Sequence, residues 1–322
     1  MAKRGRKRQL KQAGKENAPP TPPKPTIDRM ALFFEETEWM PSAAVDFYNE
    51  HNDIEEKLKN IESTTVLVGP FRKLRGETNV SGVELIMLDR ESTDLPEMQT
   101  FMRCAAGRYA FWRDTPTEKN PVIVFVDLKT VPEVTVIGNK VEHAILHFCE
   151  KFARFGEKPT TPKKVKIETL GLEDSELIRV EKEMSTAIRN RKTQTVGGIS
   201  GPGLVLVNNK SKARGYRDLT RNPNNVELLL RSLRLVGLKE HEQRIEAVIS
   251  ALMGEVQICN DEGDFGNGLE LGHLLFLANK QSIKDNMLQL LMTAYKLLGR
   301  KDFLNILLLT LENRELPFSK CY

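Results

Sequence analysis

The segment of this chain best suited to carry chemistry is CNDEGDFGNGLELG, residues 259–272. It contains four acids, and three of them, Asp261, Glu262 and Asp264, crowd a single turn. Carboxylates this close together disfavour joint ionisation, so the pattern predicts either a carboxyl group with a raised pKa or a cationic partner. We take Arg217, in the segment RGYRDL, as the candidate for that partner.

Two other interpretations of the acidic segment compete with a reactive site. A calcium loop of the EF-hand type needs oxygen ligands at alternate positions and a glutamate at the twelfth, and Gly263 and Phe265 interrupt that pattern. A structural role is the stronger alternative, because Asp and Asn favour helix N-caps and Gly ends helices. From the residues alone, the structural interpretation is favoured.

Other familiar sites find little support in this sequence. His143 and His147 have the i, i+4 spacing of metal ligands, but no third ligand follows in a recognisable frame. The glycine-rich stretch GGISGPG has no Gly-Lys-Ser/Thr ending, which argues against a phosphate-binding loop. No Gly-x-Ser-x-Gly motif is present for a serine hydrolase. We therefore expect neither a P-loop enzyme nor a hydrolase, and no bound metal.

The charge of the chain is concentrated at its N-terminus. Residues 1–26 hold eight lysines and arginines against one acid, a net charge of +7, which leaves −3 of the overall +4 for the rest. The basic and proline-rich composition of residues 1–28 predicts a disordered arm whose basic cluster resembles a nuclear localisation signal. Because the remainder is mildly acidic, we expect direct DNA binding to be weak at most, through this arm. No apolar run is long enough to span a membrane.

The elements that must position the acidic segment follow from hydropathy patterns. Residues 29–157 mix strands and helices and predict an α/β domain, whereas residues 172–322 are mainly helical and carry the acidic loop. The lysine- and proline-rich residues 158–171 are expected to link the two. The fold class is therefore α+β.

Individual elements are expected within these domains. Expected helices span 45–61, 141–155, 174–191, 225–236, 240–252, 282–298 and 301–312, and expected strands span 65–71, 83–88 and 121–128.

Two segments together resemble a known family. NDEGDFGNGLELG and RGYRDL are similar to the signature segments of the histone PARylation factors, and the likeness extends through GPGLV and the closing LENR. In the N-terminal domain the likeness is weaker and is limited to the segments LVGPF and FWRDTP.

The resemblance implies an accessory protein with no activity of its own. Such a protein docks on a DNA-damage-activated poly(ADP-ribose) polymerase and directs ADP-ribose onto serine, including serines of histones. It implies that Glu262 is the general base acting on the serine hydroxyl and that Asp261 lies beside it at the polymerase contact. Tyr216 and Arg217 would bind the partner and would also maintain the geometry of the acidic loop.

Cofactor, location and an alternative function complete these expectations. The sequence has no recognisable dinucleotide-binding segment, so NAD would be bound by the partner polymerase and not by this chain. The expected location is the nucleus, on chromatin. The alternative is a non-catalytic chromatin adaptor that bridges histones and a partner.

Overall fold

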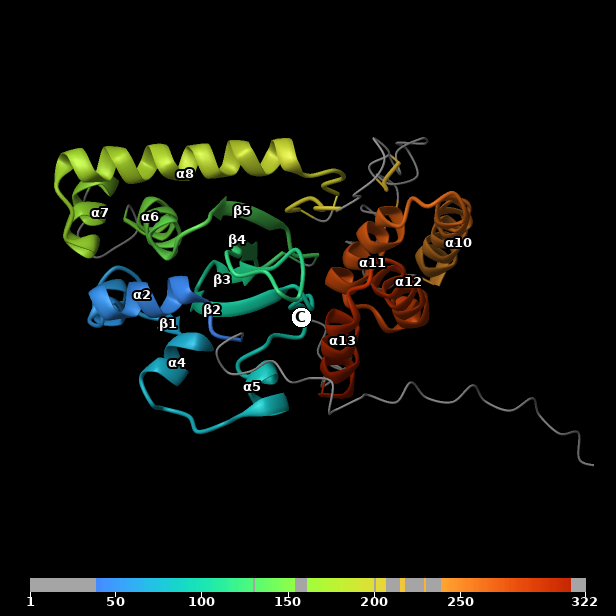
Figure 1. Ribbon diagram of the computed structural model, residues 1–322, viewed down its shortest axis with the longest axis horizontal. Helices are drawn as coiled ribbons and strands as arrows, with labels where there is room; N and C mark the ends of the chain where they lie inside the picture. Colours follow the sequence, from blue (N-terminus) through green and yellow to red (C-terminus); the bar gives the residue numbers. More distant parts are fainter. Residues whose placement is uncertain are drawn as a thin grey trace, which may run out of the picture.

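The structure is a computed structural model (Figure 1). The parts of the 322-residue chain that it describes are residues 39–129, 131–153, 161–199, 201–206, 215–217, 229 and 239–313. The expected basic arm and almost all of the expected helix at 225–236 lie outside these residues.

A five-stranded antiparallel sheet occupies the centre of the molecule (Figure 1). Its strands are β1 (Val66–Leu67), β2 (Met98–Cys104), β3 (Gly107–Trp112), β4 (Val122–Asp127) and β5 (Val134–Gly138). They pair in chain order, each with the next, and a register shift interrupts the pairing of β2 and β3 between Thr100 and Met102. Every residue of β3 is buried. Both faces of the central strands are therefore covered by other elements.

The two faces of the sheet pack against two different sets of helices. Alternate residues of a strand point to opposite faces, so Tyr109 and Phe111 of β3 contribute to one apolar core and Ala110 and Trp112 to the other. The first core contains residues of the helices that precede residue 195, apart from helix α5 (Gly82–Met87), and the second contains α5 and the C-terminal helices. The C-terminal helices thus pack directly on the sheet, and the predicted α+β fold class is confirmed.

The helices on the first face lie beside the sheet, with the long α8 running past β5 (Figure 1). They are α2 (Ser42–Glu50), α3 (Ile54–Lys59), α4 (Pro70–Leu74), α6 (Val141–Phe152), α7 (Pro162–Leu170) and α8 (Asp174–Gln194). The single helix expected at 45–61 is two helices, which residues 51–53 separate. Helix α7 falls inside the expected linker and packs against α6 and α3. The division into domains stays a prediction.

Two expected strands need correction. The segment 83–88 was expected to be extended but forms helix α5 (Gly82–Met87), which contacts α13. A short apolar run does not distinguish a strand from a buried helical turn, and burial of the adjacent Leu85 and Ile86 on one side of the segment suits the helix. The expected strand 65–71 is shortened to β1 and ends before residue 69, because Gly69 turns the chain at φ +55° and Pro70 starts α4.

The C-terminal helices form a bundle against the second face (Figure 1). They are α10 (Lys239–Asp261), α11 (Gly266–Ala278), α12 (Lys284–Leu297) and α13 (Lys301–Asn313), with the short 3₁₀ helix η2 (Gln281–Ile283) before α12. Helix α11 is buried along its whole length and contacts both α10 and α12. It is therefore the central helix of this layer. None of the helices in the described parts of the chain is long and apolar enough to cross a membrane.

Buried polar contacts fix the helices to the sheet. Glu97, immediately before β2, accepts hydrogen bonds from Tyr295 Oη at 2.9 and 3.0 Å and lies 3.0 Å from Nε2 of His273. On the other side, Arg191 of α8 donates to Asp114, with Nη2 to Oδ1 at 2.7 Å. These contacts hold α8, α11 and α12 in fixed positions relative to the strands.

Candidate functional site

The C-terminus of α10 sets the position of Glu262. The backbone N–H of Gly263 donates to the carbonyl of Asn260 at 3.1 Å, and that of Asp264 donates to Cys259 at 2.8 Å. This is the Schellman arrangement that ends a helix, with Gly263 in the left-handed region at φ +90°. Glu262 is consequently the last residue before the turn, and its half-exposed carboxylate lies at the negative end of the helix.

Substituting Gly263 tests this helix ending. Gly263→Ala is expected to destabilise the fold by about 1–2 kcal/mol, because an L-residue is disfavoured at this φ although no atom lies within 4 Å of the added methyl group. Gly254→Ala, in the interior of the same helix with equal space around it, is expected to stabilise by about 1 kcal/mol. Urea unfolding measures both. Equal effects of the two substitutions would contradict the assignment of Gly263 as the helix end.

Arg217 pairs with two of the three carboxylates of the acidic turn. Its guanidinium forms an ion pair with Glu262 through Nη2 and donates from Nε to Oδ2 of Asp264 at 2.5 Å. Partial burial by itself would lower the pKa of Arg217, but the hydrogen bonds to Asp264 and Glu262 outweigh it and raise that pKa. The cationic partner expected from the sequence is therefore present. Asp261 lies beside this pair and is exposed.

Helix α11 holds the tripeptide 215–217 in place. The backbone N–H of Gly266 donates to the carbonyl of Gly215 at 2.8 Å. The Asn267 side chain accepts from the backbone N–H of Arg217 at 3.0 Å and donates to its carbonyl at 2.7 Å. Tyr216 Oη donates to Glu270 at 2.5 Å. Arg217 is thus fixed by its backbone and its neighbour, and all four site residues expected from the sequence belong to one locality.

The acidic segment is less of a loop than the sequence predicted. Helix α10 includes Asp261, and α11 begins at Gly266, so only residues 262–265 connect the two helices. The glycines that suggested a loop allow close packing instead, since a Cβ on Gly272 would lie 2.8 Å from Cγ of Leu291 on α12. No helix was expected between residues 252 and 282, and α11 corrects that part of the prediction.

Two residues of this site, Asn267 and Glu270, were not expected from the sequence. Both are 1% exposed, although an amide and a carboxylate seldom lie in a protein interior without partners. The sequence did contain an indication of Glu270, which is the one acid in the apolar run GLELGHLLFLA. A helix that is apolar on all sides is buried, so this acid could have been expected in the protein interior.

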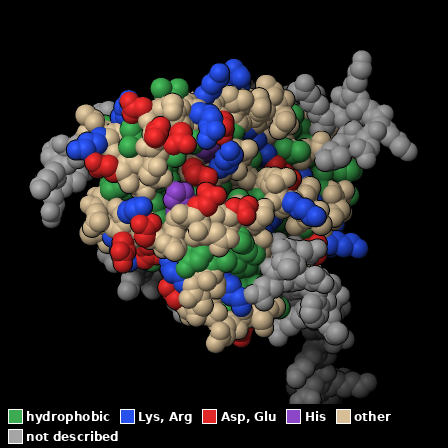
Figure 2. Space-filling view, turned by 60° about the vertical axis from the view of Figure 1, so that its left-hand side comes forward, with side chains coloured by type: hydrophobic (Ala, Val, Ile, Leu, Met, Phe, Trp, Pro, Cys, Tyr) green, Lys and Arg blue, Asp and Glu red, His purple; other side chains and the backbone are tan. Residues whose placement is uncertain are grey.

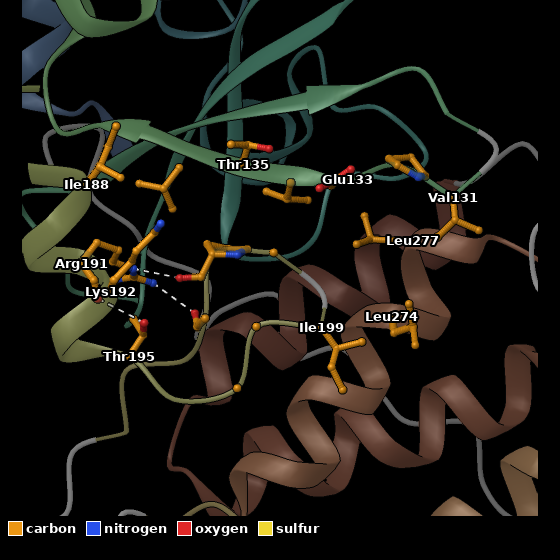
Figure 3. Close-up of a pocket in the computed structure, with 18 residues that line it drawn as sticks. Val131, Glu133, Thr135, Ile188, Arg191, Lys192, Thr195, Ile199, Leu274 and Leu277 are labelled. Carbon is orange, nitrogen blue, oxygen red and sulfur yellow. Dashed lines mark hydrogen bonds between the residues drawn. The ribbon is translucent and has the colours of Figure 1, made fainter. Parts of the chain in front are cut away.

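A cavity of about 510 Å³ lies next to this site, between β5, the end of α8 and α11 (Figure 3). Leu274 and Leu277 of α11 line one side, and Arg191 and Lys192 of α8 line another (Figure 3). The backbone of residues 197–199 lies between the cavity and Glu270, since Gly198 and Ile199 line the cavity and also donate their N–H groups to Glu270.

The two histidines with metal-ligand spacing have structural partners. His147 Nδ1 is hydrogen-bonded to Tyr109 Oη at 2.8 Å, and His143 Nδ1 accepts from the backbone of Asn139 at 3.2 Å. Burial lowers the pKa of each histidine to about 4. Within the described ranges no three His, Cys, Asp or Glu side chains are grouped as metal ligands.

Comparison with known proteins places these residues in a family. The family model described as Histone PARylation factor 1 matches residues 22–314. The chain belongs to the Histone PARylation factor 1 family. The residues of this chain that match the family model include the acidic turn, the tripeptide 215–217 and all the described helices and strands. Membership implies an accessory role alongside a poly(ADP-ribose) polymerase in histone ADP-ribosylation.

Curated relatives in the Histone PARylation factor 1 family agree with this assignment. The Histone PARylation factor 1 of Mus musculus is 29% identical over 261 residues, which cover 75% of this chain and 72% of the relative. That of Bos taurus is 28% identical over 268 residues, covering 77% and 74%. That of Danio rerio is 28% identical over 257 residues, covering 75% and 71%.

Proposed function

We propose that this chain docks on a DNA-damage-activated poly(ADP-ribose) polymerase and completes its active site with Glu262. In that joint site ADP-ribose is directed onto serine, including serines of histones, in the nucleus and on chromatin. The observation that carries the proposal is the half-exposed Glu262 carboxylate, which Arg217 holds at the end of α10. A carboxylate that is both fixed and accessible can be presented to a second protein.

The reaction explains why a polymerase would need this carboxylate. The serine hydroxyl oxygen forms a bond to the anomeric carbon of the ribose as the bond from that carbon to nicotinamide breaks. The hydroxyl is a weak nucleophile, and its proton must leave during the attack. Glu262 takes this proton. NAD is bound by the polymerase, and nicotinamide leaves with the electrons of the broken bond.

Docking would change the surroundings of Glu262 in a useful direction. In the free protein the carboxylate is 48% exposed and shares the Arg217 guanidinium with Asp264. Docking would cover this carboxylate and exclude water from the reacting hydroxyl group. The carboxylate and the reacting atoms would therefore be brought together only in the complex.

The surface of the molecule is consistent with a protein partner. On the side of the N-terminal helices, acidic and basic side chains are interspersed (Figure 2). Several form pairs there, such as Lys166 with Glu150 at 2.8 Å and Lys140 with Glu183 at 2.7 Å. Among the described residues visible on this face, the basic side chains form no continuous stripe of the kind that binds nucleic acid.

The test of this function is residue-resolved mapping of ADP-ribose on a histone tail. A DNA-activated polymerase and NAD are incubated with the tail, with and without this chain. The proposal expects serine to become the main acceptor only when the chain is present. If the acceptor residues are the same in both reactions, the proposed function is wrong; if the chain binds polymerase and histone tail without changing the acceptors, the adaptor function replaces it.

Arg217 is expected to contribute to docking as well as to the position of Glu262. Arg217→Ala should weaken binding to the polymerase catalytic domain by about 30-fold, the effect of losing a central arginine worth ~2 kcal/mol. Isothermal titration calorimetry measures this change. Arg189→Ala, which removes an exposed arginine from α8, is the control and should bind as wild type does. Unchanged affinity of Arg217→Ala would exclude this role.

A further inference from the structure

Glu270 is a buried carboxylate that the proposed chemistry does not use. It is 1% exposed, and three donors satisfy it: Tyr216 Oη at 2.5 Å, and the backbone N–H groups of Gly198 at 2.6 Å and Ile199 at 2.9 Å. A buried carboxylate is tolerated only when such donors replace water. Its partners come from two segments that are 54 and 72 residues distant in sequence.

We propose that Glu270 is a positioning residue, which fixes Tyr216 and thereby aims the adjacent Arg217 at Glu262. The effect on transfer to serine rests on the proposed function, whereas the effect on the position of Arg217 does not. Glu270 lies on α11, whose buried face is fixed against α12 and the sheet. Its carboxylate therefore has a fixed position, from which it holds the tripeptide 215–217 in place.

The local geometry leaves the tripeptide few alternatives. Asn267, one turn before Glu270 on α11, binds both backbone polar groups of Arg217, and the carboxylate holds the side chain of the preceding residue. Together they restrain both the backbone and the direction of the peptide. With these restraints the Arg217 guanidinium reaches both Glu262 and Asp264.

The glycine loop is shaped around the same carboxylate. A Cβ on Gly197 would lie 2.6 Å from Oε1 of Glu270, and Gly197 has φ +68°, so no larger residue is accommodated there without strain. The loop therefore approaches Glu270 closely enough for the next two N–H groups to donate to it. This accounts for the glycines at the start of the GGISGPG stretch, Gly197 and Gly198, which let the backbone contact Glu270.

Two substitutions of Glu270 test the positioning role, and they differ in the hydrogen bonds that they keep. Glu270→Ala removes all the acceptors. Glu270→Gln keeps one acceptor oxygen for the loop N–H groups, and the amide N–H can donate to Tyr216 Oη, since a hydroxyl group can also accept. A positioning role therefore predicts loss with alanine and substantial rescue with glutamine. Tyr216→Phe removes only the hydroxyl group and is a milder variant that should fold.

The first readout concerns geometry in the free protein. In NMR spectra, exchange of the Arg217 Hε proton with water reports its hydrogen bond to Asp264. Glu270→Ala and Tyr216→Phe are expected to accelerate this exchange about tenfold or more, and Glu270→Gln by much less. Ile306→Val, a buried substitution on α13, controls for general destabilisation and should leave the exchange rate unchanged.

The second readout is serine modification by the DNA-activated polymerase with NAD, at saturating concentrations of each variant. Misplacement of a catalytic group by about 1 Å can cost on the order of 100-fold, so Glu270→Ala and Tyr216→Phe should lower the rate of transfer by about 10- to 100-fold. Exchange at the wild-type rate in folded Tyr216→Phe and Glu270→Ala would overturn the proposal. If wild type itself does not direct modification to serine, the proposed function fails, and the exchange measurement still decides the positioning role.

Discussion

Glu262→Gln is expected to lower the rate of serine ADP-ribosylation by at least about 100-fold, the contribution that a positioned general base typically makes. The glutamine has the shape of glutamate and keeps an oxygen that can accept from Arg217, so the end of α10 should be preserved. It cannot take the proton of the serine hydroxyl. Docking on the polymerase, measured by calorimetry, is therefore expected to change by less than about tenfold.

A matched control separates this effect from the loss of a negative charge on α10. Glu255 lies seven residues earlier, two turns away on the same side of the helix. Glu255→Gln should therefore modify serine at the wild-type rate. Serine modification that persists in Glu262→Gln would remove the general base from the proposal and favour the chromatin adaptor. Loss of docking in Glu262→Gln would instead show that the carboxylate acts in binding.

Glu97→Gln is expected to destabilise the fold at neutral pH by about 3 kcal/mol. Glu97 is 2% exposed and joins the sheet to α11 and α12 through His273 and Tyr295. The amide replaces a charge-assisted acceptor and presents an N–H to one of these partners. Urea unfolding at pH 7 measures the change. Glu56→Gln, at an exposed position on α3, should alter stability by less than about 0.5 kcal/mol.

The pH dependence of this effect has a definite sign. Burial alone would raise the pKa of Glu97, but the facing His273 and the hydrogen bonds outweigh it, so the pKa is lowered. A carboxyl group whose pKa is lower in the folded state stabilises the fold above its unfolded pKa of about 4.3, and this stability is lost as the pH falls further. The difference between wild type and Glu97→Gln should shrink as the pH falls below about 4. A difference that persists undiminished at pH 3 would contradict the lowered pKa.

The sequence alone determined the local features of this protein. Hydropathy periods located the long helices α8, α12 and α13 to within a few residues, because each has one apolar face and a clear ending. The crowded carboxylates Asp261, Glu262 and Asp264 predicted a cation, and Arg217 was the candidate. Glu270 could have been flagged in the same way, as an acid within an apolar helix.

Tertiary structure decided what the local pattern left open. Residues 83–88 have an apolar composition that suits a strand or a helix, and their packing on α13 selected the helix. Tyr216 and Glu270 are 54 residues apart, so their hydrogen bond exists only because α11 packs against α12 and, through His273, against β3. The acidic turn is visible in the sequence because charge repulsion acts over a few residues. The geometry that aims Arg217 at Glu262 is not visible there, because it depends on contacts between distant segments that only the packed core brings together.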